Sequence, residues 1–341
     1  MSHQVTIKPS GHIYSVAADD TILNAAVEAG FNLPYGCRNG ACGACKGSVL
    51  EGKVDYGDFQ AGALTEDEKQ AGLALFCCAK PLTDMVIECR EVTASSGIRP
   101  RIMPARVQKM EKVSHDVMVL FLKLPSNERM QFMAGQYVDF LLKDGKRRAF
   151  SIANAPHSDE LLEMHMRLIP DGQFTRYVFD EMHEKAILRL EGPFGSFYLR
   201  EDSDKPVIFV AGGTGFAPIK GIIEHMMHHK MQRQIILYWG AYAGEDLYMP
   251  ELPQQWQAEY PNFTYIPVLS EPQPEDNWQG RTGLVHDAVL EDHADLSSYQ
   301  VYCGGAPQMV EIAHQAFQKH GMPEEEFFSD AFTFSNPPPK K

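Results

Sequence analysis

Hydrophobic and polar residues alternate over residues 5–7 and 12–16, and a period of two is typical of strands with one buried face. Apolar residues then recur at helical spacing over residues 21–29, and Gly30 follows as a stop signal. A β-rich stretch over residues 85–89 predicts a later strand. The first part of the chain is therefore expected to form a small α+β unit.

The centre of the chain has a different pattern, in which short apolar stretches are separated by turn residues. The stretches cover residues 117–122, 137–141 and 162–168. This spacing is typical of an antiparallel β-barrel or sandwich. Before it, residues 93–104 contain small polar residues and two prolines, a composition typical of a linker.

The last part of the chain alternates fully apolar strands, over residues 206–210 and 235–239, with helical segments such as 217–229. This alternation predicts a parallel α/β sheet. The predicted organisation is an α+β domain over 1–94, a linker over 95–102, an antiparallel β-barrel over 103–202, an α/β nucleotide domain over 203–335 and a disordered tail over 336–341.

Charge separates the same regions. The net charge of the 341 residues is −14, which argues against nucleic-acid binding. Residues 95–200 carry 16 basic and 13 acidic side chains, whereas 1–94 carry 7 and 12, and 201–341 carry 8 and 20. A polyanionic ligand is therefore expected in the middle third. No apolar run approaches the ~18 residues of a membrane span. The chain also begins without a signal pattern, which predicts a cytoplasmic protein with no membrane contact.

Cysteines are concentrated in the first part of the chain, which holds six of the seven. Cys37, Cys42 and Cys45 have the C-x4-C-x2-C spacing of plant-type 2Fe-2S centres, and Cys77 is the predicted fourth ligand. Zinc prefers paired C-x2-C knuckles, of which only one is present. Buried free cysteines would not explain three thiols in a short, glycine-rich loop. The other two early cysteines are expected to be a bystander and a strand core residue, Cys78 and Cys89 respectively.

A flavin site is predicted in the basic middle third. Arg148 can pair with a diphosphate, Phe150 can lie against a flat ring, and Ser151 can hydrogen-bond a ring nitrogen. An exposed arginine and a core phenylalanine would explain the same residues. The turn over residues 170–175 strengthens the prediction because it leads into a helix expected over 176–182. The start of a helix offers backbone N–H groups to a phosphate.

A glycine loop over residues 209–218 joins a buried strand to a helix, where the backbone can approach a pyrophosphate. It differs from the G-x-G-x-x-G fingerprint, so a tight structural turn is the alternative. Residues 240–246, where a ribose 2′ position would be read, include acids and no arginine, which favours NADH over NADPH. A third loop over 302–307 is expected to face the same crevice.

In this order, the motifs resemble the ferredoxin–NADH reductase family, which includes reductase components of benzoate dioxygenase, phenol hydroxylase and methane monooxygenase. The segment 36–43 and the Cys-Ala-Lys-Pro after Cys77 are most similar to the CDP-6-deoxy-glucoseen reductase-like group. The resemblance covers residues 3–332. It implies a β-grasp ferredoxin domain, a flavin barrel and a nicotinamide domain, with a 2Fe-2S cluster, FAD and NADH as cofactors.

The resemblance also implies roles for individual residues. Ser151, Cys303 and Phe332 would surround the reacting flavin and nicotinamide. The family's cysteine aligns with Gly304, one residue after Cys303, and successive strand side chains face opposite ways. The other implied cofactor contacts are Arg148, Ala149, Phe150, Gly172, Gln173 and Thr175 for FAD, and Gly213, Thr214, Gly215, Gly304 and Gly305 for the nicotinamide nucleotide.

These expectations describe an electron-splitting reductase. NADH would give a hydride to FAD, and electrons would pass singly through the 2Fe-2S cluster to an acceptor protein, expected to be an oxygenase component. A pyridoxamine-dependent sugar dehydratase is the alternative acceptor. Two other classes stay open: a non-catalytic redox-sensing module, and a free-standing diaphorase or flavin reductase.

Overall fold

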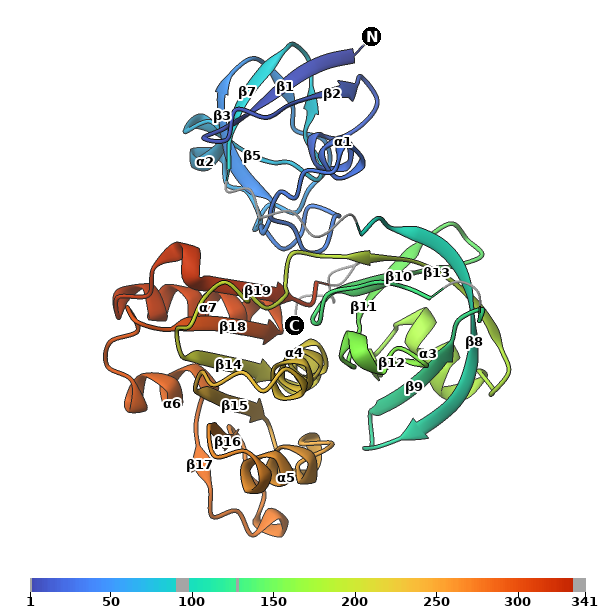
Figure 1. Ribbon diagram of the computed structural model, residues 1–341, viewed down its shortest axis with the longest axis vertical. Coiled ribbons are helices and arrows are strands. Elements are labelled where there is room, and N and C mark those ends of the chain that lie inside the picture. Colours follow the sequence, from blue (N-terminus) through green and yellow to red (C-terminus); the bar gives the residue numbers. More distant parts are fainter. Residues whose placement is uncertain (1, 90–97, 127–128, 334–341) are drawn as a thin grey trace. The chain divides into compact units, whose positions relative to one another are not determined.

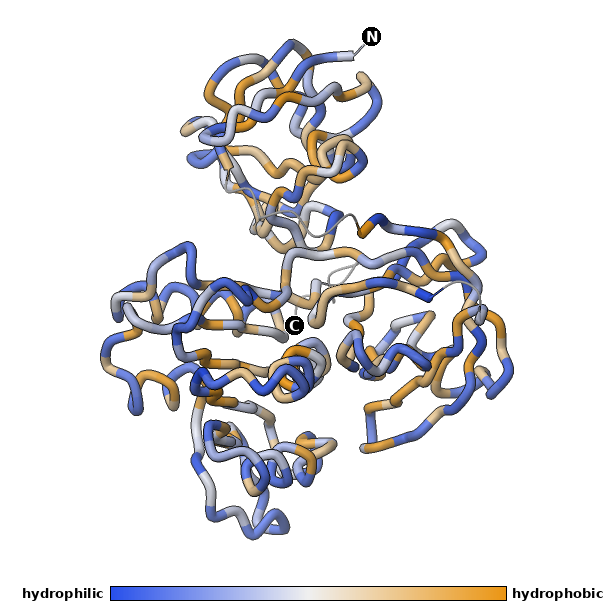
Figure 2. Tube along the Cα trace, in the orientation of Figure 1, coloured by the Kyte–Doolittle hydropathy of each residue, from blue (hydrophilic) through white to orange (hydrophobic). Residues whose placement is uncertain are grey.

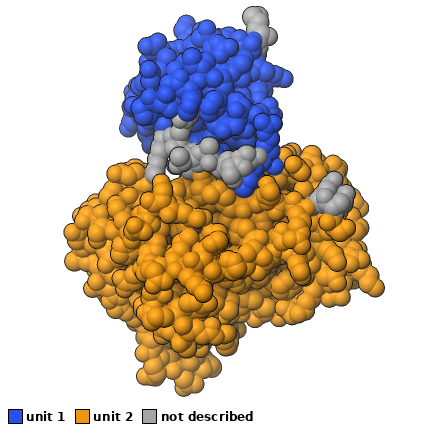
Figure 3. All heavy atoms as spheres, viewed as in Figure 1, with its two compact units in different colours: residues 1–99, 331–341 blue, residues 100–330 orange. Residues whose placement is uncertain are grey.

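The fold is taken from a computed structural model that describes residues 2–89, 98–126 and 129–333. Two compact units make up the chain. Unit 1 comprises residues 1–99 and 331–341, and unit 2 comprises residues 100–330 (Figure 3). Residues 95–97 of the predicted linker and all of the predicted tail lie outside the described residues.

Unit 1 is built on a five-stranded sheet of order β2-β1-β7-β3-β5 (Figure 1). Strand β1 pairs antiparallel with β2 and parallel with β7. Helix α1 begins after Thr21, whose side chain accepts the Asn24 N–H, and it ends at Gly30 in a left-handed conformation. The bounds are β1 Ser2–Lys8, β2 Ile13–Ala17, α1 Ile22–Ala29, β3 Lys46–Glu51, β4 Val54–Asp55, α2 Glu66–Gln70, β5 Leu73–Leu75, β6 Lys80–Pro81 and β7 Met85–Glu88.

The early strands and the helix agree with the sequence prediction, but the prediction for Cys89 is wrong. Strand β7 ends at Glu88, and Cys89 lies after it, half-buried rather than in the core. Its backbone N–H donates to the Lys8 carbonyl at 3.3 Å. The strand's buried positions are Met85 and Ile87, so a further residue with the same period of two would fall beyond its paired segment.

The first half of unit 2 is an antiparallel sheet of order β11-β10-β13-β8-β9-β12. A bridge between Ile152 and Met164 joins the two end strands, so the sheet closes into the predicted barrel. Helix α3 packs against it through Phe174 and Val178. The bounds are β8 Arg101–Lys112, β9 Val117–Lys123, β10 Tyr137–Leu141, β11 Arg147–Ser151, η1 Pro156–Ser158, β12 Leu162–Arg167, α3 Gln173–Asp180 and β13 Ile187–Phe194.

Two element boundaries differ from the prediction. Strand β8 begins at Arg101, inside the predicted linker, and contains Pro104. Pro104 pairs with β13, whereas the pairing of β8 with β9 begins only at Arg106, so the missing N–H of proline is tolerated at an edge. Helix α3 begins at Gln173 rather than at 176, because Gly172 is already its N-cap.

The second half of unit 2 is a sheet of order β17-β16-β15-β14-β18-β19, in which β14 to β18 are parallel. In Figure 1, α4 and α5 lie on one side of this sheet, and α6 and α7 lie on the other. The bounds are β14 Val207–Gly212, η2 Gly213–Gly215, α4 Phe216–His228, β15 Ile235–Ala241, η3 Gly244–Asp246, α5 Glu251–Glu259, β16 Phe263–Leu269, η4 Pro274–Asp276, β17 Arg281–Thr282, α6 Val285–Asp292, β18 Gln300–Gly305, α7 Pro307–Lys319, η5 Glu324–Glu326 and β19 Phe327–Ala331.

The chain first winds outward from β14 through β15 to β17 and then returns to β18 on the other side of β14. Such a reversal leaves a crevice at the carboxyl ends of the two central strands, where ligands bind in open α/β sheets. Helix α4, which starts at this crevice, is buried along most of its length and carries hydrophobic colouring in Figure 2. Within the described residues, none of the helices has both the length and the apolar character to cross a bilayer.

A buried polar network links the barrel to α4 within unit 2. Glu163 of β12 accepts from His165 Nε2 at 2.7 Å and from Lys220 Nζ at 3.0 Å, and His165 Nδ1 lies 2.8 Å from the Tyr248 hydroxyl. Burial lowers the pKa of His165, so the ring is neutral. Burial would raise the pKa of Glu163, but the bonds from His165 and Lys220 hold that pKa at about 2. The carboxylate is therefore charged, and Lys220 balances it.

Candidate functional site

The cysteine loop between α1 and β3 surrounds its own sulfur atoms with backbone donors. Cys37 Sγ accepts the N–H groups of Ala41 at 3.4 Å and of Cys42 at 3.3 Å. Cys42 Sγ in turn accepts the N–H of Cys37 at 3.4 Å. Ligand sulfurs of an iron–sulfur cluster are electron-rich and are stabilised by such donors, so the loop fits a cluster.

The four predicted ligand sulfurs interact in pairs. A hydrogen bond from Cys42 lowers the pKa of the Cys37 thiol to about 6, and one from Cys45 lowers the pKa of the Cys77 thiol to about 4. Cys77 follows β5, more than thirty residues after the loop, yet its sulfur lies within reach of Cys45. The structure therefore brings the four predicted ligands together.

Glycine is required where the loop packs closely on other sulfurs. A Cβ at Gly36 would lie 3.2 Å from Cys42 Sγ, and a Cβ at Gly40 would lie 2.7 Å from Cys78 Sγ and 2.7 Å from the Phe59 Cβ. Gly40 also has a positive φ of 71°. Larger side chains would push the loop away from the sulfur atoms that it encloses.

The two arginines of the predicted flavin segment differ in their partners. Arg147 forms ion pairs with Asp139 on the adjacent strand β10 and with Glu191 on β13, the strand beyond it. Arg148 donates to the carbonyl of Arg147 at 2.8 Å, and among the described residues no carboxylate forms an ion pair with it. Arg148 is therefore the guanidinium with capacity to bind a phosphate.

Strand β11 places Phe150 beside the N-terminus of α3. The Phe150 ring lies 5.6 Å from that of Phe140 and 5.8 Å from that of Phe174, the second residue of α3, and it stays half-exposed. No side chain caps α3, so its first N–H groups can meet an anion. Arg148, Phe150 and the start of α3 thus combine a cation, an aromatic face and helix donors.

The structure gives two of the predicted phosphate ligands a local role. The Thr175 hydroxyl donates to the Gly172 carbonyl at 3.1 Å and accepts the Ile169 N–H at 3.1 Å. A Cβ at Gly172 would lie 2.6 Å from Thr175 Oγ1. Both residues shape the turn that presents α3. Gln173 begins the helix, and Ala149 is exposed on β11.

Ser151 has a partner that the sequence interpretation missed. Its hydroxyl donates to Asp330 Oδ2 at 3.0 Å, across 179 positions of the chain. Asp330 lies in β19, the end strand of the nucleotide-domain sheet, so the contact joins the end of barrel strand β11 to that sheet. A serine that is 8% exposed and held by a carboxylate has a defined hydroxyl orientation. The pattern around Asp330 gave no signal for this pairing, because it depends on the sheet order.

The two glycine loops at the crevice are in direct backbone contact. A Cβ at Gly215 would lie 2.0 Å from the Gly304 carbonyl oxygen, and a Cβ at Gly305 would lie 3.0 Å from the Gly212 carbonyl oxygen. Strand β14 and strand β18 bring them together by parallel pairing, with Ala211 opposite Gly304. The predicted nucleotide residues Gly213, Thr214, Gly215, Gly304 and Gly305 therefore occupy one place at the carboxyl ends of adjacent strands.

Arg167 of β12 reaches the same loop, a second residue missed in the sequence. A Cβ at Gly213 would lie 3.1 Å from its Nη1. Within the part of the chain that the structure describes, its buried Nη2 has no hydrogen-bond partner, and its Nε lies 3.3 Å from Asp116 Oδ2. A buried guanidinium nitrogen without a partner is costly unless a ligand completes its hydrogen bonding. Only the strand order reveals this arginine, which lies outside every motif.

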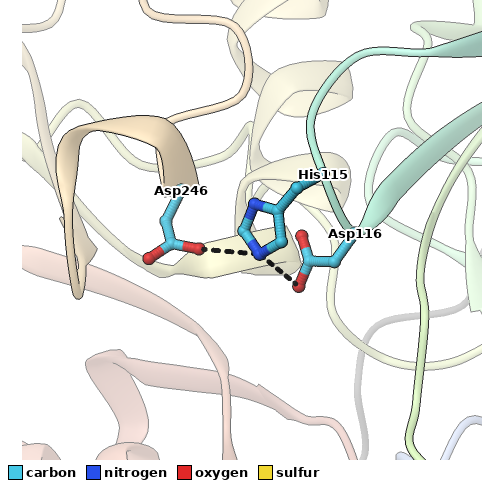
Figure 4. Close-up of side chains that lie close together, drawn as sticks. All are labelled: His115, Asp116 and Asp246. Atoms are coloured by element: carbon cyan, nitrogen blue, oxygen red, sulfur yellow. Dashed lines mark ion pairs between the residues drawn. The ribbon is translucent and has the colours of Figure 1, made fainter.

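Acidic groups gather around the loop that follows β15. His115 Nε2 lies 3.9 Å from Asp116 Oδ2 and 4.0 Å from Asp246 Oδ1 (Figure 4). Glu245 Oε2 lies 3.9 Å from Nδ1 of the same ring. Three of these ligand atoms fall within 4.8 Å of one another, but the Asp116 carboxylate already pairs with Arg167, and we assign no cation to the cluster.

Comparison with known proteins agrees with this geometry. The 2Fe-2S iron-sulfur cluster binding domain matches residues 5–82, the oxidoreductase FAD-binding domain matches 104–198, and the oxidoreductase NAD-binding domain matches 209–315. The CDP-6-deoxy-L-threo-D-glycero-4-hexulose-3-dehydrase reductase of Yersinia pseudotuberculosis is 39% identical over 97% of this chain and 99% of that protein. The chain belongs to the family of iron–sulfur flavoprotein reductases.

Other members of this reductase family are similar over the same length. Reductase component 1 of the terephthalate 1,2-dioxygenase of Comamonas sp. is 34% identical over 98% of each chain. The crystal structure of the Amycolatopsis cytochrome P450 reductase GcoB has a TM-score of 0.82 and 31% identity, and the match covers 98% of this chain and 100% of that one. The predicted multidomain fold class, the oxidoreductase activity and binding of a 2Fe-2S cluster, FAD and NAD are confirmed.

The structure gives less support to two of the residues predicted to surround the flavin and the nicotinamide, Cys303 and Phe332. Cys303 is opposite Val210 in the sheet and is wholly buried, and burial raises the pKa of its thiol to about 12. Its role at the nicotinamide stays a prediction, against which this burial argues. Phe332 follows β19 and is half-buried, and its role as a flavin shield also stays a prediction.

Proposed function

We propose that this reductase passes electrons from NADH to a protein acceptor, with its cluster held by Cys37, Cys42, Cys45 and Cys77. The convergence of these four sulfurs, enclosed by backbone N–H donors, carries the proposal. When bound, the flavin accepts a hydride and the cluster carries single electrons. The protein residues bind and orient these groups and exclude water from them.

On the flavin side, Arg148 and the start of α3 are proposed to bind the FAD diphosphate, while Phe150 lies against the ring. Ser151 is proposed to face the ring nitrogen that receives the hydride. Asp330 holds the Ser151 hydroxyl at 3.0 Å, which supports a positioning role for this carboxylate. A held hydroxyl needs no reorientation when the hydride donor arrives.

On the nucleotide side, the glycine loop and Arg167 are proposed to hold the pyrophosphate of NADH. The buried Nη2 of Arg167 beside Gly213 supports this assignment, because it has no partner among the described residues and a phosphate oxygen would complete its hydrogen bonding. Gly304 and Gly305 carry no side chain, which allows the end of β18 to approach the loop closely. Thr214 is 9% exposed and is proposed to contribute mainly through its backbone.

The preference for NADH over NADPH is proposed to arise after β15. Glu245 and Asp246 place carboxylates there, and the segment 240–246 contains no arginine or lysine. A 2′-phosphate would be repelled by these carboxylates and would find no cation in the segment. Asp246 also accepts the Ala243 N–H at 3.1 Å, so its position is part of the turn itself.

The acceptor is proposed to be an oxygenase component, as in the terephthalate dioxygenase system. A sugar-nucleotide dehydrase is the second candidate, supported by 39% identity to the Yersinia dehydrase reductase. Stopped-flow reduction of each purified partner type would separate them, because only the true partner should show saturable, fast reduction. A cytoplasmic location is proposed from the free thiols, which suit a reducing compartment.

An anaerobic NADH titration, with iron and flavin quantified on the same sample, tests the electron route. Uptake of three electrons per chain, two on FAD and one on the cluster, is expected. Uptake of two electrons with the cluster left oxidised would contradict the route and would favour a sensor or a partner-gated module. Cytochrome c reduction that survives removal of the iron would favour a plain diaphorase.

A further inference from the structure

A second thiol adjoins the proposed fourth ligand. Cys78 Sγ lies 3.6 Å from Cys77 Sγ, within the range of a sulfur hydrogen bond. The family motif requires only one cysteine at this place, and the sequence interpretation treats Cys78 as a bystander. Its distance from the Cys77 sulfur instead places it in contact with the cluster's own ligand.

The backbone around Cys78 holds this sulfur in place. The Cys78 N–H donates to the Leu75 carbonyl at 2.9 Å. A Cβ at Gly57 would lie 2.5 Å from the Cys78 carbonyl oxygen, and a Cβ at Gly40 would lie 2.7 Å from Cys78 Sγ. The sulfur therefore packs between the cysteine loop and Cys77, where Gly40 makes room for it, while Gly57 makes room for the Cys78 carbonyl group.

The direction of the hydrogen bond follows from the chemistry of a ligand. A cysteine bound to iron is a thiolate and can only accept, so the proton between the two sulfurs belongs to Cys78. We infer that the Cys78 thiol donates a hydrogen bond to the Cys77 sulfur and thereby raises the reduction potential of the cluster. Hydrogen bonds to ligand sulfurs stabilise the more negative, reduced cluster. The inference rests on the proposed assignment of Cys77 as a ligand.

The test compares variants that differ in the donor. Cys78→Ala removes it, Cys78→Ser replaces it with a hydroxyl donor, and Cys89→Ala removes a half-buried thiol of the same unit as a matched control. The cluster's midpoint potential is measured by spectroelectrochemical titration with electron paramagnetic resonance. The FAD potential, in the other unit, is an internal reference, and iron content is measured on each protein.

We expect Cys78→Ala to keep its iron and to shift the cluster to a more negative potential, with the FAD potential unchanged. Cys78→Ser is expected at or above the wild-type potential, and Cys89→Ala at the wild-type value. An iron-replete Cys78→Ala protein with the wild-type potential would overturn the inference and leave the ligand assignment intact.

Iron lost from Cys78→Ala but retained in Cys77→Ala would overturn both, because Cys78 would then be the ligand. If Cys78→Ala misfolds and therefore does not hold iron, the midpoint potential of the cluster in Cys78→Ser tests the inference. A potential more negative than the wild type in that variant would refute the role of the donor.

Discussion

The cluster loop and the nicotinamide crevice are built in opposite ways. Three of the four cluster cysteines fall within nine consecutive residues, and their own loop supplies the N–H donors. At the crevice, Arg167, Gly215 and Gly304 come from three different strand ends and meet only through the order of two sheets. A site formed by one segment can be predicted from the sequence, whereas a site formed by several strand ends depends on the whole fold.

The largest effect is expected when the cluster site loses one ligand. Cys77→Ala should leave the cluster unassembled, because the loop supplies only three thiolates. NADH-dependent reduction of cytochrome c should then fall by at least an order of magnitude, while flavin-dependent reduction of ferricyanide persists. Iron content, visible absorption and the two activities measure this. Retained iron with unchanged cytochrome c activity would refute the assignment, and Cys89→Ala is the control.

Next in size is the loss of the buried cation that links the two halves of unit 2. Lys220→Met removes a buried ammonium and leaves the half-buried carboxylates of Glu163 and Glu224 without their shared partner, and we expect a loss of about 3–5 kcal/mol in the free energy of unfolding. The control is Lys205→Met, whose pair with Glu326 is more exposed and should contribute no more than about 1 kcal/mol. Denaturant unfolding measures both losses. Equal losses of stability in Lys220→Met and Lys205→Met would contradict the prediction that the buried lysine contributes more.

The same network predicts a pH dependence. The pKa of Glu163 is lowered by its partners to about 2, below that of an unfolded glutamate at roughly 4.3. A lowered carboxyl pKa stabilises the fold above the unfolded pKa, and this contribution disappears as the pH falls towards 2. Thermal unfolding from pH 5 to 2 should show a steeper loss for the wild type than for Glu163→Gln. Parallel curves would mean that Glu163 is not the group responsible.

A smaller effect is expected where the crevice loops touch. Gly215→Ala places a Cβ 2.0 Å from the Gly304 oxygen, so the loops must separate, with a loss of about 1–3 kcal/mol in stability and a raised KM for NADH. Gly62→Ala is the control, since nothing lies within 4 Å of its Cβ and its φ is not positive. An unchanged KM would show that the contact does not shape the nucleotide site.

Ser151 and Asp330 are expected to affect flavin reduction together, through the hydrogen bond between them. Ser151→Ala and Asp330→Asn should each slow flavin reduction by NADH, and the double variant should be little worse than either one. The expected coupling is about 1 kcal/mol or more in a double-mutant cycle. Stopped-flow absorbance gives the rates. Strictly additive effects would mean that Asp330 does not act through the Ser151 hydroxyl.

The smallest effect concerns the choice of nucleotide. Glu245→Arg puts a cation where the structure has an exposed carboxylate, so the ratio of kcat/KM for NADH to that for NADPH should fall. Glu259→Arg makes the same change of charge at the end of α5 and should leave the ratio unchanged. Equal shifts in the two variants would point to the overall charge rather than to the loop after β15.

The sequence by itself determined the features that lie within one segment. The cysteine spacing, the α1 boundaries at Thr21 and Gly30 and the apolar strands of the nucleotide domain could all be predicted, because capping, periodicity and ligand spacing are local. The sequence predictions were wrong where pairing with a neighbouring strand sets the bounds of an element. Pro104 lies in β8 because β9 leaves that edge unpaired, and Cys89 lies beyond the end of β7.

Only the tertiary structure decided which distant groups meet. Asp330 reaches Ser151, Arg167 reaches Gly213, and Cys303 is buried in the centre of a sheet, because strand order and register set these neighbours. Cys78 is an intermediate case: its neighbour in sequence is a predicted ligand, but Gly40 packs against its sulfur and Gly57 against its backbone carbonyl. Local chemistry can be read from residue types and spacing, whereas contacts between strand ends form only when long-range pairing closes the fold.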